Sequence, residues 1–136
     1  MRLTSEQRIF SEVENLLERK ITWAETTLWS PHIENSVKGV YILRTKKHIL
    51  YVGKGSIRNR LNTHEQKLSG NLRGAKMTYK FKLLHEAKLA PPVTEVYVEF
   101  FECNATERSM CEGYLIHKLQ PPLNDEVDCN LMERLG

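Results

Sequence analysis

The sequence predicts an α/β domain of the α+β kind, in which a small, three-stranded, mostly antiparallel sheet is flanked by helices. Amphipathic segments alternate with three short runs rich in β-branched and aromatic residues, at residues 40–45, 49–52 and 94–102. Pairs of prolines at residues 91–92 and 121–122 end helical segments. The chain has 136 residues, the size of one domain that buries its own core.

The first 37 residues are expected to form an N-terminal helical extension that packs on the core. Apolar residues recur there with the spacing of one helix face: Ile9, Phe10, Val13, Leu16 and Leu17. The helix is expected to end near Lys20. Residues 21–37 are interpreted as an irregular connection in which Trp23 and Trp29 are packing anchors. The extension is also a candidate surface for a homodimer.

Residues 40–45 and 49–52 predict a β-hairpin around Lys46-Lys47-His48. Its register decides which side chains share a face, because successive residues of a strand point to opposite faces. A three-residue loop sets Tyr41 opposite Tyr51 on one face. A two-residue loop instead pairs Tyr41 with Val52 and turns Tyr51 to the other face. Both registers stay open.

A helix is expected over residues 57–68, with Ile57, Leu61 and Leu68 on one apolar stripe. Arg60 and His64 are i, i+4 neighbours at the border of that stripe, and Lys67 lies farther around the same edge. Arg58 points about 100° the other way and is expected to face outward. The helix therefore distinguishes its two first-turn arginines.

Residues 53–56, Gly-Lys-Gly-Ser, are interpreted as a tight turn in which Ser56 caps that helix. The run is not a nucleotide-binding P-loop, because Ser or Thr does not follow the Gly-Lys pair directly. The dinucleotide-binding fingerprint also fails, since Arg58 occupies its third glycine position. What remains is a set of backbone N–H groups beside Lys54 that suits a single phosphate.

The remaining elements follow from the same patterns. A loop is expected over residues 69–75, a helix over 76–89, a strand over 94–102 and a final helix from the 104–107 capping box to about residue 119. Residues 125–136 are expected to be a tail laid on the surface, with room for one short helical turn.

Residues 38–82 form a strongly basic segment. They contain twelve Lys or Arg and one acidic residue, whereas the rest of the chain contains eight basic and sixteen acidic residues. A charge separation of this size favours a polyanionic partner, most often a nucleic acid. A solvated basic face is the alternative.

Composition narrows the cellular setting and the redox chemistry. No apolar run approaches the roughly 20 residues that span a bilayer, so no membrane partner is expected. The N-terminus lacks the apolar core of a secretory signal, which makes a cytoplasmic location the simplest expectation. Cys103, Cys111 and Cys129 lack the spacing of a zinc site and are expected to be reduced thiols.

Glu112 stands out because it points into the apolar arc of the final helix. An ionised carboxylate in such a place costs several kcal/mol unless it is paired or bound to a cation. An i, i+4 ion pair with Arg108 is the alternative explanation. Gly113 lowers helix propensity by about 1 kcal/mol and leaves room beside the carboxylate.

Taken in order, these residues resemble the GIY-YIG nuclease family. The chain contains Gly39-Val40-Tyr41, Tyr51-Val52-Gly53, Arg60, His64, Glu112 and Asn124. Tyr51 follows Tyr41 by ten positions, Lys54 follows the second motif, and the run Pro-Pro-Leu-Asn ends at Asn124. The resemblance covers residues 39–124 and is closest to the UvrC-type N-terminal nuclease domain and to small phage and restriction enzymes. It implies a nuclease core over residues 38–124.

This resemblance implies a metal-dependent DNA endonuclease that hydrolyses a phosphodiester bond with one active site per chain. The implied catalytic residues are Tyr41, Tyr51, Arg60, His64 and Glu112. Glu112 is the implied ligand of Mg²⁺, for which Mn²⁺ is expected to substitute. The implied phosphate or DNA contacts are Gly53, Lys54, Arg58, Lys67 and Asn124.

Several roles stay open at this point. Tyr51 is favoured as the general base or the group that positions water, with Tyr41 orienting it and His64 as the second candidate. Arg58 is a rival for the arginine role because the loop before it is one residue shorter than is common in the family. The alternative functions are a catalytically silent DNA-binding module and a nuclease that acts on RNA. Repair-like nicking and phage or restriction-type cleavage both fit.

Overall fold

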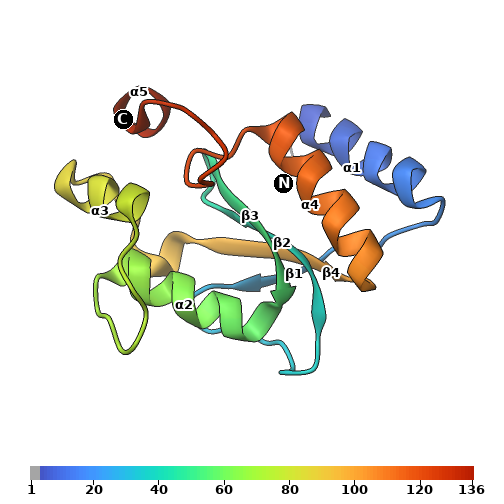
Figure 1. The fold of residues 1–136 in the computed structure, drawn as a ribbon, viewed down its shortest axis with the longest axis horizontal. Coiled ribbons are helices and arrows are strands. Elements are labelled where there is room, and N and C mark those ends of the chain that lie inside the picture. Colours follow the sequence, from blue (N-terminus) through green and yellow to red (C-terminus); the bar gives the residue numbers. More distant parts are fainter. Residues whose placement is uncertain (1–3) are drawn as a thin grey trace.

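The computed structural model describes residues 4–136, with side chains from Gln7 onward. Residues 1–3 of the predicted extension lie outside the described part. The fold is α+β, with the N-terminal helix before the sheet (Figure 1). The elements in chain order are α1 (Thr4–Leu17), β1 (Ala24–Thr27), β2 (Lys38–Arg44), β3 (Ile49–Ser56), α2 (Ile57–Ser69), α3 (Tyr79–Glu86), η1 (Val93–Glu95), β4 (Tyr97–Glu102), α4 (Ala105–Leu119) and α5 (Leu131–Leu135).

The sheet has four strands rather than the expected three. All neighbouring strands are antiparallel, and their order is β1-β4-β2-β3. The additional strand is β1, which lies inside the segment expected to be irregular. It pairs with β4. Its sequence, Ala-Glu-Thr-Thr, has no apolar alternation, so the strand depends on pairing with β4 rather than on a local pattern. The N-terminal segment therefore supplies one edge of the sheet.

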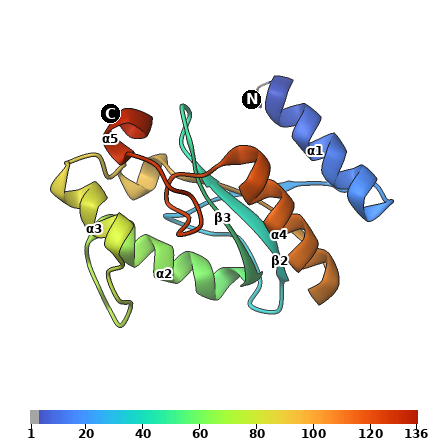
Figure 2. The same ribbon diagram turned by 45° about the horizontal axis from the view of Figure 1, so that its top comes forward.

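Helices cover both faces of the sheet (Figures 1 and 2). On one face, α2 and α3 pack in a core that contains Tyr41, Leu61 and Phe81. On the other face, α1 and α4 pack in a core that contains Val13 and Leu115. Burial of apolar side chains on both faces is the main force that holds these layers together. None of the helices in residues 4–136 has the length and apolar character needed to cross a bilayer.

The β2–β3 hairpin adopts a register that neither predicted alternative contains. Tyr41 lies opposite Gly53 and Leu43 lies opposite Tyr51, and a bulge shifts the register between Leu43 and Arg44. Cross-strand partners share a face, and Tyr51 and Gly53 are two residues apart, so Tyr41 and Tyr51 lie on the same face. The two tyrosines are therefore diagonal neighbours instead of direct partners.

Residues 53–56 belong to β3 and do not form the expected tight turn. Gly53 is required in the strand because a Cβ at this position would overlap the phenol of Tyr41. The φ angle of Gly55 is 119°, a conformation that glycine adopts readily. Ser56 occupies the N-cap position of α2, but its side chain makes no capping hydrogen bond. The expected cap bond is therefore wrong, although the start of the helix is right.

Helices α1 and α3 are shorter than expected, whereas α4 has the expected length. Helix α1 ends at Leu17 because Glu18 takes a positive φ of 57°. Helix α3 covers Tyr79–Glu86 within the expected 76–89. Helix α4 begins with the expected capping box between Asn104 and Glu107.

The two tryptophans of the N-terminal segment differ in burial. Trp23 packs between Phe10 and Phe101. Its ring centroid lies 4.6 Å from that of Phe10 and 4.7 Å from that of Phe101. Trp29 is 65% exposed, so its expected role as a packing anchor is wrong. The segment is thus anchored through Trp23 and β1.

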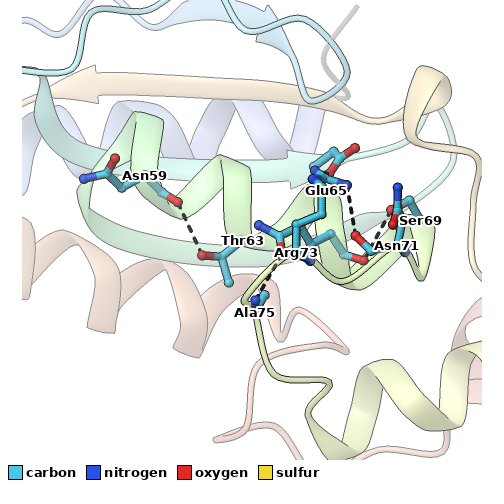
Figure 3. A network of polar contacts seen from close by, with 8 residues as sticks. Asn59, Thr63, Glu65, Ser69, Asn71, Arg73 and Ala75 are labelled. Atoms are coloured by element: carbon cyan, nitrogen blue, oxygen red, sulfur yellow. Dashed lines mark hydrogen bonds and ion pairs between the residues drawn. The ribbon is translucent and has the colours of Figure 1, made fainter.

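A polar network fixes the loop that follows α2 (Figure 3). The buried side-chain oxygen of Gln66 accepts hydrogen bonds from the main-chain N–H groups of Arg73 at 2.6 Å and Ala75 at 3.0 Å. The Arg73 guanidinium lies 2.5 Å from the Glu65 carboxylate and also donates to the carbonyl oxygen of Asn71 at 2.9 Å. The positive charge of Arg73 is therefore paired with a carboxylate of the same chain.

The three cysteines are free thiols, as their spacing predicts. Cys103 and Cys111 are buried, and Cys129 is half-buried. Burial raises the pKa of the Cys103 thiol and raises that of Cys111 to about 12. The two buried thiols are therefore protonated at neutral pH and fill the core as small apolar groups.

Candidate active site at the edge of strand β3

The predicted site residues gather at β3, an edge strand of the sheet. Helix α2 lies on one face beside this strand and helix α4 on the other (Figure 2). Side chains alternate along the strand, so Tyr51 points to the α2 face and Lys54 to the α4 face. Groups from both sides of the sheet thereby meet around one edge.

Tyr41, His64 and Arg60 form the inner part of the site. The Tyr41 hydroxyl lies 2.8 Å from Nε2 of His64 and accepts a 3.4 Å hydrogen bond from Nε of Arg60. Tyr41 is 0% exposed and His64 is 1% exposed, whereas Arg60 is open to solvent. Arg60 and His64 are one helical turn apart on α2, which is why both reach the same hydroxyl.

Tyr51 completes the aromatic cluster. Its ring centroid lies 6.2 Å from that of Tyr41, with the rings stacked, and 4.5 Å from that of His64. Tyr51 is half-buried, in contrast to its two enclosed neighbours. It is therefore the member of the cluster that solvent reaches.

Burial sets the protonation states of this cluster. It raises the pKa of both tyrosine hydroxyls, and the positive charge of Arg60 opposes the rise. Burial, followed by the charges of Arg60 and Lys67, lowers the pKa of His64 to about 3. At neutral pH both phenols are therefore protonated and the imidazole is neutral. Within the described residues, Nδ1 of His64 has no hydrogen-bond partner.

Glu112 reaches the same strand edge from α4. Its side chain is 24% exposed, and burial raises the pKa of its carboxyl group, against the opposing charge of Lys54. The Lys54 ammonium lies 3.9 Å from Oε1 of Glu112 and donates a 3.1 Å hydrogen bond to Ser109 Oγ. Arg108 donates instead to the carbonyl oxygen of Cys103 at 2.7 Å. The cation beside Glu112 is therefore Lys54 and not Arg108.

Glu126 is a second carboxylate near the site and has no counterpart among the predicted site residues. Its negative charge raises the pKa of both Glu112 and Tyr51, so it lies within electrostatic range of both. Glu126 is exposed and belongs to the stretch interpreted as a surface tail. Its place two residues after Asn124 is the one signal in the sequence that could have indicated it.

The two other basic residues predicted to contact DNA lie in different settings. Arg58 donates a 2.8 Å hydrogen bond to the carbonyl oxygen of Ile33, which ties it to the segment before β2. Lys67 is half-buried, and its ammonium lies 5.2 Å from the centre of the Phe81 ring. Burial and the charge of Arg60 lower the pKa of Lys67. Lys67 therefore borders the site, whereas Arg58 has a structural partner.

Asn124 is buried and contacts the strand itself. Its Oδ1 accepts a 2.9 Å hydrogen bond from the N–H of Val52, and its Nδ2 donates a 2.8 Å bond to the carbonyl oxygen of Val52. The neighbouring Leu123 N–H donates to the carbonyl oxygen of Leu50 at 3.0 Å. These hydrogen bonds satisfy main-chain groups on the open edge of β3, as a neighbouring strand would. The polar groups of Asn124 thus hold the strand, and no described contact joins them to Glu112.

The fold uses part of the basic segment for internal contacts. Four of its basic residues bind carboxylates or carbonyl oxygens away from the candidate site: Arg44, Arg58, Arg73 and Lys80. Lys54 and Arg60 lie beside Glu112 and Tyr51 instead, and the charge of Lys67 acts on His64. The positive charge at the candidate site therefore comes from a defined subset of the segment.

Glu112 fits a magnesium ion that keeps most of its water ligands. Within residues 7–136, whose side chains are described, no cluster of three or more His, Cys, Asp or Glu could hold a metal ion. Magnesium needs only one or two carboxylates and retains several waters. Burial raises the pKa of Glu112, and the negative charge of Glu126 raises it further; that second carboxylate is the feature that favours an added cation.

No protein-family model, curated protein or solved structure matches this chain. The support for a function therefore comes from the arrangement at β3 and from the order of the motif residues. That arrangement brings two phenols, an imidazole, a guanidinium, an ammonium and a carboxylate to one strand edge.

Proposed function

We propose that the chain is a metal-dependent DNA endonuclease of the GIY-YIG type, with one active site that hydrolyses a phosphodiester bond. The observation that supports this most is the convergence of Arg60 and Glu112 on Tyr51. The charges of both residues act on the Tyr51 hydroxyl, although they come from helices on opposite faces of the sheet. A basic group for phosphate, a group for water and a carboxylate for a cation are the parts that such hydrolysis needs.

Arg60 and Lys54 bind the scissile phosphate in this proposal. The exposed guanidinium of Arg60 has N–H groups that match phosphate oxygens, and Lys54 adds a second positive charge from the α4 side. A water oxygen forms a bond to phosphorus while the bond between phosphorus and the leaving sugar oxygen breaks. Negative charge grows on the phosphate oxygens during this step, and the fixed cations stabilise it.

Tyr51 is the group that positions the attacking water, and it accepts that water's proton only as the phenolate, after its own proton has left to solvent. Tyr41 and His64 are enclosed, so Tyr51 is the phenol of the cluster with solvent access. The positive charge of Arg60 favours the phenolate form against the effect of burial. Tyr41, held by His64 and Arg60, fixes the neighbouring ring. His64, the second candidate base, is less favoured because burial encloses its imidazole and lowers its pKa to about 3.

Glu112 is the residue that would hold the divalent cation, with Glu126 as a nearby source of negative charge. A divalent cation such as Mg²⁺ or Mn²⁺ held there would supply stabilisation of the negative charge that develops during hydrolysis. The protein's own part is to keep Glu112 half-buried beside Lys54, whose charge favours the carboxylate form against the effect of burial.

A substrate panel tests this proposal. The purified chain is incubated with supercoiled plasmid, single-stranded DNA and RNA, each with Mg²⁺ or with a chelator, and the products are separated on gels. The expected result is conversion of supercoiled to nicked plasmid that requires Mg²⁺. Binding of DNA without cleavage would support the catalytically silent module, and cleavage confined to RNA would support the alternative substrate.

A further inference from the structure

The ammonium of Lys80 lies at the centre of three main-chain carbonyl groups. Its Nζ donates hydrogen bonds to the carbonyl oxygens of Pro122 at 3.1 Å, Asn124 at 2.5 Å and Val127. An ammonium group has three N–H donors, and each one finds an acceptor here. Lys80 belongs to α3, more than 40 residues before its partners in the chain. The contact is therefore a tertiary link between a helix and a distant loop.

The partner segment, residues 121–127, is compact and largely buried. The N–H of Asn124 donates to the carbonyl oxygen of Pro121 at 3.2 Å, and that of Val127 donates to the carbonyl oxygen of Asn124 at 3.1 Å. Leu123 and Val127 are each 2% exposed. Carbonyl dipoles that converge on one point repel one another unless a cation or donor lies between them. The ammonium of Lys80 removes that repulsion.

The same segment covers the edge of β3. Leu123 bonds to Leu50, and the side chain of Asn124 bonds to both backbone groups of Val52. Val52 stands between Tyr51 and Gly53, the glycine on which the Tyr41 ring lies. A continuous set of contacts therefore runs from Lys80 through Asn124 to the strand that carries Tyr51.

We propose that Lys80 is a positioning residue whose ammonium organises residues 121–127 so that Asn124 holds β3, and with it Tyr51, in place. The effect on the strand follows from the contacts alone. The effect on catalysis rests on the proposed nuclease function. Lys80 itself contacts loop carbonyl groups and takes no part in binding the phosphate.

Amide hydrogen exchange tests the effect on the strand without any assay of activity. Lys80→Met keeps an unbranched side chain that is one atom shorter and removes its three donors. We expect exchange at the N–H groups of Val52 and Leu123 to become at least ~10-fold faster, while Ile42 in the sheet interior changes less than ~2-fold. The matched control is Lys82→Met, on the exposed side of the same helix. Unchanged exchange at Val52 and Leu123 would overturn the proposal.

Chemical rescue separates positioning from simple loss of packing. In Lys80→Ala, added n-propylammonium should restore slow exchange at Val52, because it fits the vacated stem and donates to the carbonyl groups. Tetramethylammonium carries the same charge without N–H donors and should have no effect. Equal results with the two ions would contradict the proposal. This experiment also decides the case if Lys80→Met does not fold, since refolding of Lys80→Ala should then require n-propylammonium.

The catalytic consequence has its own readout. Lys80→Met should lower kcat for plasmid nicking ~10-fold with KM changed less than ~2-fold, because Arg60 and Lys54 remain to bind DNA. n-Propylammonium should restore the kcat of Lys80→Ala. If the wild-type chain cleaves no nucleic acid, the proposed nuclease function fails, whereas the exchange experiment still decides the role of Lys80.

Discussion

The Tyr41 hydroxyl lies 2.8 Å from Nε2 of His64, and both side chains are enclosed, with at most 1% of either exposed. A charged imidazolium in this place would be separated from water and would lie beside the cations Arg60 and Lys67. His64 is therefore neutral in the folded protein, and protonation of this residue favours unfolding.

The stability of the protein should accordingly fall with acid in a way that depends on His64. The pKa of His64 is lowered from 6.5 to about 3, so between these values the unfolded chain binds a proton that the folded chain does not. The contribution to the unfolding free energy is present above about pH 6.5 and is lost toward pH 3, by at most about 1.4 kcal/mol per pH unit. Urea unfolding of wild type and His64→Gln over this range measures it. If the unfolding free energy falls by the same amount with pH in the two proteins, His64 is not neutral and buried.

Replacement of the two arginines of α2 should have unequal effects. Arg60→Ala should lower the rate of DNA cleavage by a factor on the order of 10²–10³, because it removes the guanidinium at the tyrosine hydroxyls. Arg58→Ala should change the rate less than ~3-fold and act mainly on stability, since Arg58 binds the Ile33 carbonyl group. Cleavage rates and thermal melts of both variants provide the comparison. The reverse ranking would show that Arg58 is the phosphate-binding arginine.

Two glycine-to-alanine changes should shift stability in opposite directions. Gly53→Ala adds a methyl group that overlaps the phenol of Tyr41. It should destabilise the fold by roughly 1–3 kcal/mol. Gly113→Ala lies in α4, where a Cβ would meet nothing within 4 Å, and should stabilise by up to about 1 kcal/mol. Chemical denaturation measures both. A neutral Gly53→Ala variant would mean that the ring does not lie on the strand as described.

Asn124→Ala should destabilise the protein by about 1–3 kcal/mol, because the buried N–H and carbonyl groups of Val52 both lose their partner. The control is Asn62→Ala, an exposed position on α2 that should change stability by less than about 0.5 kcal/mol. Denaturant unfolding compares the two. If Asn124→Ala keeps wild-type stability but loses cleavage, Asn124 acts on the reacting groups and not on the strand.

Much of the fold could be predicted from local pattern. The helical period places Arg60 and His64 together and turns Arg58 elsewhere, and the structure shows this arrangement. The capping box predicts the start of α4. These features depend on neighbours within one helical turn, which the sequence displays directly.

What could not be predicted depends on partners far apart in the chain. Strand β1 forms because β4 offers an edge, and the hairpin register depends on a bulge after Leu43 that no turn residue announces. Glu126 and Lys80 acquire their places only when residues 121–127 fold across β3. The family resemblance ends at Asn124 and so gives no indication of Glu126.

The proposed nuclease function depends most on Glu112, and the most direct test is plasmid cleavage under single-turnover conditions by wild type and Glu112→Gln at saturating Mg²⁺. The wild-type chain should nick the plasmid, and the variant should be slower by at least a factor on the order of 10³ while its affinity for DNA changes less than ~3-fold. Cleavage by Glu112→Gln at the wild-type rate would contradict the assignment of Glu112 as the residue that holds the catalytic metal ion.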